Sequence, residues 1–157
     1  MKRLWAPWRM QYIEGPKEPG CIFCFDPEFD ADRHVLRREE HALVMLNRYP
    51  YTNGHVMVVP TAHVHRPHLL SAEASAALHV LLMRSTEALE AHYGCEGMNL
   101  GMNLGRVAGA GVDDHVHYHI VPRWNGDHNF MPVLGDARII NEHLDETYQK
   151  LKPVFDW

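Results

Sequence analysis

The chain has 157 residues, of which 46% are hydrophobic and 22% are charged, and its formal net charge at pH 7 is −5. This length and composition predict one globular domain over residues 1–157 with room for a core. Its Lys and Arg residues are scattered, which argues against a nucleic-acid partner. No apolar run approaches the roughly 20 residues that cross a bilayer, and the N-terminus lacks a signal-peptide core. We therefore expect a cytoplasmic protein without a membrane partner.

Residues 1–20 form an aromatic N-terminal segment with little periodicity. Its large apolar residues lie among Arg, Pro and Gly, and they are Trp5, Trp8, Tyr12 and Ile13. Because exposed tryptophan is uncommon, we expect this segment to pack on the domain or on a second subunit.

A Cys-x-x-Cys motif at Cys21 and Cys24 follows this segment. In the cytoplasm such a pair is more typical of metal ligands or thiols than of a disulfide. Its spacing suits two thiolates on one tetrahedral zinc ion. The alternatives are a pair of buried thiols and a redox pair. The candidates for the remaining zinc ligands are His63 or His65, together with His115.

The next part of the chain predicts an antiparallel pair of strands. A short strand is expected at 35–38, and two buried strands are expected at 41–47 and 55–60. The connection at 48–54 is rich in turn residues, and Asn53-Gly54 supplies a position that tolerates left-handed backbone. Asn47 and His55 stand at the two ends of this turn.

A long helix is expected over 71–93, with Ser71 as its N-cap and Gly94 as its stop. Its apolar residues recur at spacings near three and four, at Leu78, Leu81, Leu82, Ala88 and Leu89. We interpret His79 as a surface or packing residue of this helix rather than as a ligand.

A strand at 98–105 and a second helix at 135–151 complete the expected elements. The second helix has apolar residues on one side, at Ile139, Ile140, Leu144, Tyr148 and Leu151. The order of strands, helix, strands and helix predicts an α+β domain with an antiparallel sheet and two main helices.

The most informative stretch is His115-Val116-His117-Tyr118-His119-Ile120-Val121. On a β-strand, alternate side chains share a face, so the three histidines would point one way and the apolar residues the other. Three imidazoles on one face are costly unless a metal, a ligand or a reaction satisfies them. The middle histidine, His117, has neighbours on both sides and is the natural nucleophile.

This stretch resembles the histidine triad signature of the HIT superfamily of nucleotide hydrolases and transferases. Residues 3–9, Arg-Leu-Trp-Ala-Pro-Trp-Arg, resemble the N-terminal segment of the microbial branch that includes diadenosine tetraphosphate phosphorylases. The resemblance implies a HIT-like fold that forms a homodimer, with helix 71–93 and the N-terminal segment as interface candidates. It also implies that His63 and His115 complete a zinc site with Cys21 and Cys24. Four protein ligands would leave no open coordination position for substrate, so the zinc would be structural.

The resemblance assigns roles to two further groups of residues. The catalytic group is a nucleophile with its supporting donors, and it comprises His117, His119, His115 and His55. The nucleotide-binding group would contact the ribose and the polyphosphate, and it comprises Asn47, Asn103, Gly109, Ala110 and Gly111.

Together, the residues and the resemblance predict an enzyme that cleaves dinucleoside polyphosphates, such as diadenosine tetraphosphate, through a covalent nucleotidyl-histidine intermediate. Water or inorganic phosphate would be the second acceptor. HIT hydrolases often carry Gln where this chain has Gly111, which favours the phosphorylase-like branch. The third triad position is His119 rather than the Gln of uridylyltransferase relatives, which argues against sugar-1-phosphate transfer. The alternatives are a metalloprotein whose histidine cluster binds a transition metal, and a nucleotide-binding module with weak phosphoramidase activity.

Overall fold

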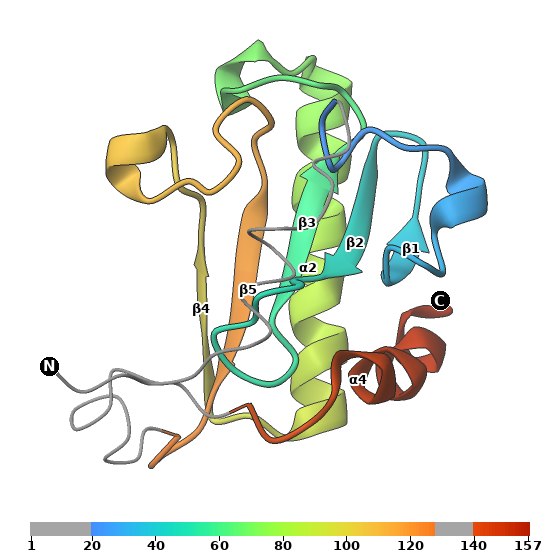
Figure 1. Ribbon diagram of the computed structural model, residues 1–157, viewed down its shortest axis with the longest axis vertical. Coiled ribbons are helices and arrows are strands. Elements are labelled where there is room, and N and C mark those ends of the chain that lie inside the picture. The colour runs from blue at the N-terminus through green and yellow to red at the C-terminus, as the bar shows by residue number, and fades with distance from the viewer. Residues whose placement is uncertain (1–19, 128–139) are drawn as a thin grey trace, which may run out of the picture.

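The computed structural model describes residues 20–127 and 140–157. Its centre is an antiparallel sheet of five strands in the order β1-β2-β3-β5-β4 (Figure 1). The strands span Val35–Arg38 (β1), Ala42–Leu46 (β2), Val56–Pro60 (β3), Gly97–Gly101 (β4) and Tyr118–Arg123 (β5). The helices are Ala72–Tyr93 (α2) and Leu144–Leu151 (α4), and 3-10 turns lie at Pro27–Phe29 (η1), Pro67–Leu69 (η2), Arg106–Ala108 (η3) and Lys152–Phe155 (η4). The predicted α+β fold is confirmed.

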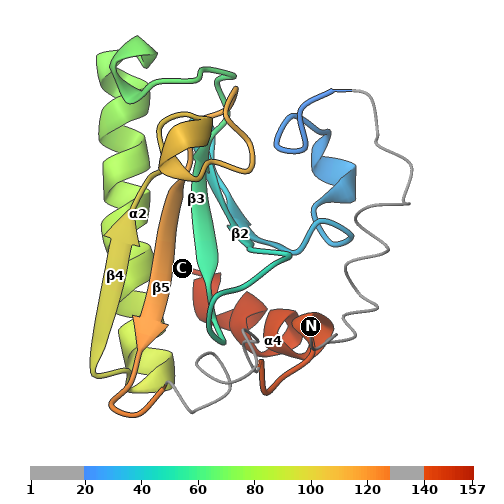
Figure 2. The ribbon, with the colours of Figure 1, turned by 60° about the vertical axis from the view of Figure 1, so that its left-hand side comes forward.

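Helix α2 forms where the capping and apolar signals of the sequence agree. The Ser71 hydroxyl accepts a hydrogen bond from the Ala74 backbone N–H at 3.1 Å, and Gly94 ends the helix in left-handed backbone. Figure 2 shows α2 running along one face of the sheet. The buried residues of α2 include the predicted Leu78, Leu81, Leu82 and Leu89. This helix is confirmed, and His79 is exposed, which selects the surface interpretation over the packing one.

Strands β2 and β3 are buried along their whole length, and their alternate residues enter two separate cores. One core lies under α2 and includes Val44 and Ile120. The other includes Met45, Met57 and Phe23. We call these two sides the helix face and the site face of the sheet. Burial on both faces explains why these strands read as continuous apolar runs in the sequence.

The second helix begins later than the sequence predicts. The expected start at 135 and Ile139 fall within 128–139, outside the described residues, and residues 140–143 are not helical. Two hydrogen bonds fix residues 140–143 in their non-helical conformation. The Asn141 N–H donates to Asn53 Oδ1 at 3.1 Å, and the Thr147 hydroxyl donates to Glu142 at 2.7 Å. The helix therefore begins at Leu144, and Ile140 fits the helical period without belonging to the helix.

Two predicted strands also differ in extent. The strand expected at 98–105 ends at Gly101, and the chain then turns towards η3 through Gly105, which has a φ of 95°. Strand β5 begins at Tyr118, so His115 and His117 precede it. The Val116 N–H donates instead to the Val64 carbonyl of a loop, at 2.7 Å. The prediction of three histidines on one strand is therefore wrong, because a loop replaces the neighbouring strand there.

Residues 1–19 lie outside the described residues, so the predicted packing of the N-terminal segment and the single-domain assignment stay predictions. Homodimerisation also stays a prediction. It is consistent with the exposed apolar side chains of Val80 and Met83 on α2. Among the described residues, no helix has the length and apolar character needed to span a bilayer.

Gly54 closes the turn between β2 and β3 and closely approaches Tyr93 of α2. Its φ is 74°, and a Cβ at this position would lie 2.4 Å from Tyr93 Cε2. We expect Gly54→Ala to lower the free energy of unfolding by about 2–4 kcal/mol, because backbone strain and steric overlap add. Gly126→Ala is the matched control: its φ is 75°, no described atom lies within 4 Å of the added Cβ, and the expected loss is about 1 kcal/mol. Urea denaturation measures both losses, and equal losses would contradict the steric argument.

Candidate functional site

A cluster of four metal-ligating side chains lies beyond one end of the central strands. Its members are Cys21, Cys24, His63 and His115, and their ligand atoms all lie within 4.8 Å of one another. The Cys21 Sγ is 3.3 Å from His115 Nδ1, and the Cys24 Sγ is 3.4 Å from His63 Nδ1. Bonds of about 2.3 Å to sulfur and 2.0 Å to nitrogen at a tetrahedral angle place such atoms roughly 3.5 Å apart. The four residues therefore fit one tetrahedral metal ion, and the geometry selects His63 over His65.

The surroundings of the cluster also suit a cation. The His115 ring is fully buried, and its Nε2–H donates to the Pro60 carbonyl at 2.8 Å, which leaves the Nδ1 lone pair facing the sulfurs. Metal-binding histidines typically donate such a hydrogen bond from the ring nitrogen that does not bind the metal. Burial raises the pKa of the Cys21 thiol to about 11. A thiolate at this position is therefore disfavoured unless a cation compensates its charge.

His117 is held as a neutral imidazole with one nitrogen engaged. Its Nδ1–H donates to the His115 carbonyl at 2.9 Å, and only 5% of the residue is exposed. Burial lowers the pKa of His117, and the hydrogen bond to the carbonyl opposes this only in part. The ring is therefore neutral and carries its lone pair on Nε2. This is the form that a nucleophilic imidazole requires.

His55 and His119 form a hydrogen-bonded pair beside His117. The Tyr51 backbone N–H donates to His55 Nδ1 at 3.0 Å, and His55 Nε2 lies 2.9 Å from His119 Nδ1. Because Nδ1 of His55 accepts, its proton is on Nε2 and is donated to His119. His119 then carries its own proton on Nε2. The rings of His117 and His119 are 4.9 Å apart, so a nitrogen lone pair and an N–H donor are held by adjacent side chains.

The protonation of His119 predicts how stability depends on pH. Burial, and then the neighbouring His117 ring, lower the pKa of His119 to about 4, against about 6.5 in an unfolded chain. Between these values the unfolded chain binds a proton that the folded chain does not, so the free energy of unfolding falls as the pH drops from about 6.5 to about 4. Urea denaturation at several pH values should show that the free energy of unfolding falls less in His119→Gln than in the wild type over this pH range. The same fall in both proteins would contradict this assignment.

Two aromatic residues belong to the site although the sequence analysis did not select them. Phe23 is buried, and its ring centroid lies 5.4 Å from that of His115 and 4.9 Å from that of His117. Tyr51 lies against His55, with a centroid distance of 4.6 Å. An aromatic residue inside the Cys-x-x-Cys motif was an available signal for Phe23. No sequence pattern distinguishes Tyr51 from an ordinary turn residue.

The predicted nucleotide-binding loop lies beside this site. The amides of Gly109 and Ala110 donate within the loop, to the carbonyls of Arg106 at 3.0 Å and Gly105 at 3.3 Å. Among the described residues, none accepts a hydrogen bond from the Gly111 amide. Of the three predicted loop residues, Gly111 is therefore the one whose N–H is available to an anion.

Neighbouring contacts fix the position of this loop. Val112 packs on the site-face core that contains Phe23, and Asn103 Nδ2 lies 4.0 Å from a Cβ built on Gly109. Asn103 thus lies beside the loop, as expected.

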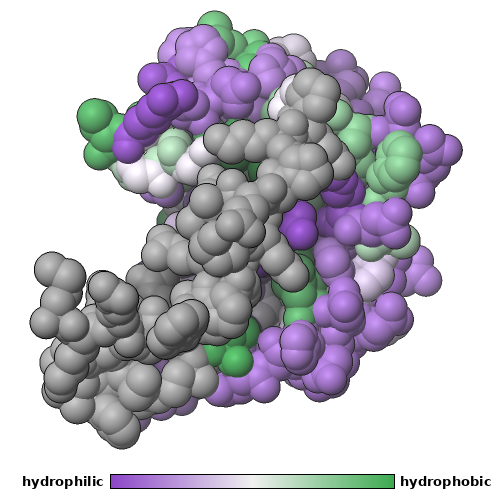
Figure 3. All heavy atoms as spheres, viewed as in Figure 1, coloured by the Kyte–Doolittle hydropathy of each residue, from purple (hydrophilic) through white to green (hydrophobic). Residues whose placement is uncertain are grey.

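In Figure 3 the described part of the visible face is mostly hydrophilic, with a hydrophobic patch at its left edge over η3, where Val107 is fully exposed.

Asn47 lies next to the His55–His119 pair. Its Oδ1 accepts the Tyr49 backbone N–H at 2.8 Å, which orients the carboxamide and places Nδ2 3.4 Å from His55 Nε2. The structure thus brings Asn47 and His55, at the two ends of one turn, together with His119, which lies 64 positions after His55.

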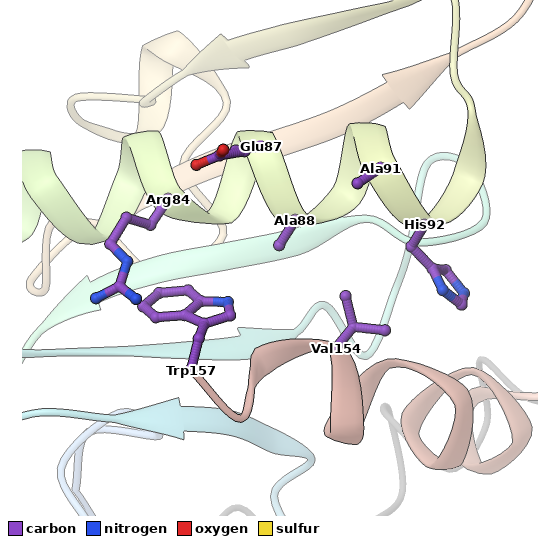
Figure 4. Close-up of a pocket in the computed structure, with 7 residues that line it drawn as sticks. All are labelled: Arg84, Glu87, Ala88, Ala91, His92, Val154 and Trp157. Atoms are coloured by element: carbon purple, nitrogen blue, oxygen red, sulfur yellow. The ribbon is translucent and has the colours of Figure 1, made fainter.

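A separate surface pocket of about 480 Å³ lies between α2 and η4 (Figure 4). The Arg84 guanidinium covers the Trp157 ring at 3.5 Å from its centroid, and Val154 and His92 also line the pocket. Because α2 and η4 pack on the helix face, this pocket is on the other side of the sheet from the histidines. It includes none of the predicted site residues.

Comparison with known proteins identifies the family. The model of the HIT domain matches residues 28–126. The chain belongs to the HIT domain family. The recognised triad motif and the observed fold agree with this assignment.

Individual HIT relatives cover most of the chain. An AP-4-A phosphorylase from Mycobacterium tuberculosis is 34% identical over 161 residues, which cover 96% of this chain and 83% of the relative. The adenosine 5'-monophosphoramidase hnt1 of Schizosaccharomyces pombe is 35% identical and covers 69% of this chain and 78% of its own. A zinc-bound histidine triad protein from Mycobacterium smegmatis matches with a TM-score of 0.69 and 27% identity, over 87% of this chain and 93% of its own. The family and these relatives support a nucleotide-processing enzyme.

Proposed function

We propose that this HIT protein cleaves dinucleoside polyphosphates, such as diadenosine tetraphosphate, through a covalent nucleotidyl-histidine intermediate on His117. The observation that carries the proposal is the pair of complementary imidazoles, with a lone pair on His117 Nε2 and a proton on His119 Nε2. The similarity to an AP-4-A phosphorylase over almost the whole chain supports this substrate class.

In the first proposed step, His117 Nε2 attacks the α-phosphorus, a P–N bond forms, and the P–O bond to the leaving polyphosphate breaks. The Nδ1–H remains on the ring and donates to the His115 carbonyl, which offsets the positive charge of the substituted imidazole. His119 donates a hydrogen bond from Nε2 to a phosphate oxygen that gains charge. Inorganic phosphate or water then attacks the same phosphorus, and the P–N bond breaks to restore neutral His117. An attacking water gives up one proton to the solvent, whereas a phosphate oxygen attacks as an anion.

The nucleotide-binding roles are proposed for residues around the pair. Asn47 would contact the ribose, since its carboxamide is oriented beside His55. The Gly111 amide would contact the polyphosphate, with Asn103, Gly109 and Ala110 shaping the loop. Substrate recognition would thus combine side chains from the β2–β3 turn with the backbone of the loop after η3.

We propose that the metal held by the four-residue cluster is zinc with a structural role. Two Cys and two His ligands occupy all four tetrahedral positions and leave none for substrate. The zinc-bound structural relative supports this identity. Bound there, zinc would keep the two sulfurs as thiolates, while the chain's own Phe23 packs against His117.

A metal centre on the triad itself is not favoured. Among the described residues, the one group of His, Cys, Asp and Glu side chains that could hold an ion includes His115 but neither His117 nor His119. The nucleotide-binding module with weak phosphoramidase activity remains the alternative, and adenosine 5'-monophosphoramidate is its test substrate.

Product analysis with diadenosine tetraphosphate tests the proposal, with and without inorganic phosphate. ADP and ATP that form only with phosphate would identify a phosphorylase, in agreement with the glycine at position 111. AMP and ATP without phosphate would identify a hydrolase. Cleavage of the monophosphoramidate alone would overturn the proposed substrate class.

A further inference from the structure

We propose that the backbone amide of Tyr51 is a positioning group that sets the tautomers of His55 and His119. Through this chain of hydrogen bonds, His119 presents an N–H rather than a lone pair on the side of the ring away from His55. Only the last step, donation to a phosphate oxygen, rests on the proposed function.

The series of hydrogen bonds starts at a group that can act only as a donor. A backbone amide can only donate, and the Tyr51 N–H lies 3.0 Å from His55 Nδ1. A proton on this nitrogen would face the amide hydrogen, so both the Nδ1–H tautomer and the cation of His55 are disfavoured. The remaining form is the neutral ring with its proton on Nε2. His55 is 1% exposed, so water does not compete for these nitrogens.

The tautomer of His55 then determines the tautomer of His119. His55 Nε2 and His119 Nδ1 are 2.9 Å apart, so one of them donates. Donation by His119 would leave His55 with no proton on either nitrogen, which is an imidazolate and is excluded near neutral pH. His55 therefore donates, and the neutral His119 ring carries its proton on Nε2.

Asn47 does not reverse this assignment. Its Oδ1 is taken by the Tyr49 N–H at 2.8 Å, so the Nδ2 group faces His55 Nε2, at 3.4 Å. This contact is 0.5 Å longer than the 2.9 Å contact from His119 Nδ1 to the same His55 nitrogen. The shorter contact therefore takes the proton of His55.

The turn holds the Tyr51 amide by contacts that do not use the Tyr51 side chain. The Asn47 N–H donates to the His55 carbonyl at 3.0 Å, and the His55 N–H donates to the Thr52 carbonyl at 3.3 Å. The Thr52 hydroxyl donates to the Pro122 carbonyl of β5 at 3.0 Å. Tyr51 is 42% exposed, and its ring packs on His55 and stacks on His119, with centroid distances of 4.6 Å and 5.9 Å. The amide and the ring can therefore be removed separately.

Three substitutions separate these contributions. Tyr51→Phe and Tyr51→Ala keep the N–H, whereas Tyr51→Pro removes it. Ring ¹⁵N chemical shifts from long-range ¹H–¹⁵N NMR spectra report the tautomer of each histidine, and His55→Gln and His119→Gln spectra assign the two rings. We expect Nε2–H for both rings in the wild type, in Tyr51→Phe and in Tyr51→Ala. In Tyr51→Pro we expect His55 to populate Nδ1–H and His119 to lose its single tautomer.

Kinetics provide the second measurement. In Tyr51→Pro we expect kcat for diadenosine tetraphosphate to fall about tenfold or more with little change in KM, by analogy with other lost orienting hydrogen bonds. In Tyr51→Ala, which keeps the N–H but loses the ring that packs on His55 and His119, we expect a smaller fall in kcat than in Tyr51→Pro. Circular dichroism and metal content check that the variants fold.

The proposal is overturned if wild-type His55 carries its proton on Nδ1 or is cationic near neutral pH, and this result does not depend on the folding of any variant. It is also overturned if folded Tyr51→Pro keeps the wild-type ring shifts. The expected ring shifts in a protein that cleaves no dinucleoside polyphosphate would support the tautomer assignment and contradict the proposed function instead.

Discussion

Replacing His117 with Asn is expected to lower turnover of diadenosine tetraphosphate by at least about 10⁴-fold, which is the size of loss typical when a covalent nucleophile is removed. The reason is that the Nε2 lone pair is the group that would form the P–N bond. The Asn side chain still offers an N–H to the His115 carbonyl that accepts from His117 at 2.9 Å, so the fold should be preserved. Steady-state kinetics and equilibrium binding of a non-cleavable analogue separate the lost chemistry from binding, which should stay within a few-fold.

The matched control for this variant is His79→Asn, the same change at an exposed position of α2. It should keep wild-type turnover. Rapid denaturation during turnover should trap one nucleotidyl group on the wild-type peptide that contains His117, detected by mass spectrometry. Turnover of His117→Asn at the wild-type rate, or an adduct on another residue, would contradict the assigned nucleophile.

Replacing Cys24 with Ser is expected to remove the bound metal and to lower the free energy of unfolding by about 4 kcal/mol, when free metal is about a thousandfold above its Kd for the wild type. The change removes one of two thiolates at a site that closes long stretches of chain. Turnover should also fall, because the segment that carries Phe23 packs against His117 and is held by the cluster. Elemental analysis, urea denaturation and kinetics measure the three effects.

Cys95→Ala provides the control, since Cys95 is a buried cysteine outside the cluster. It should keep the wild-type metal content and lose only the packing of a small buried side chain. Full metal content in Cys24→Ser would show that the cluster is not the metal site. Loss of metal without loss of turnover would show that Phe23 does not transmit its effect.

The elements predicted best from the sequence are those for which local and tertiary signals agree. Helix α2 has a capping residue, a helical apolar period and a glycine stop, and all three are realised in the structure. The central strands were recognisable because burial on both faces demands continuous apolar runs. The start of α4 was not, because it depends on a contact between Asn141 and the distant turn residue Asn53.

The residue types of the candidate site were predictable from the sequence, but the direction of each hydrogen bond within it was not. Alternation correctly placed His117 and His119 near one another, although β5 begins only at Tyr118. Which nitrogen carries each proton depends on carbonyls and amides of other segments, such as Pro60 and Tyr51, and no side-chain pattern encodes them. The choice of His63 over His65 likewise depends on how the loop after β3 folds.

The two ends of the metal cluster are separated by 94 positions, between Cys21 and His115. During synthesis, the first thiol is made long before the imidazole that faces it, and closing so long a loop carries an entropy cost. The same histidine supplies the carbonyl that orients His117. The proposed nucleophile would therefore reach its working orientation only after this loop has closed, and an ion bound by the four ligands would favour that closure.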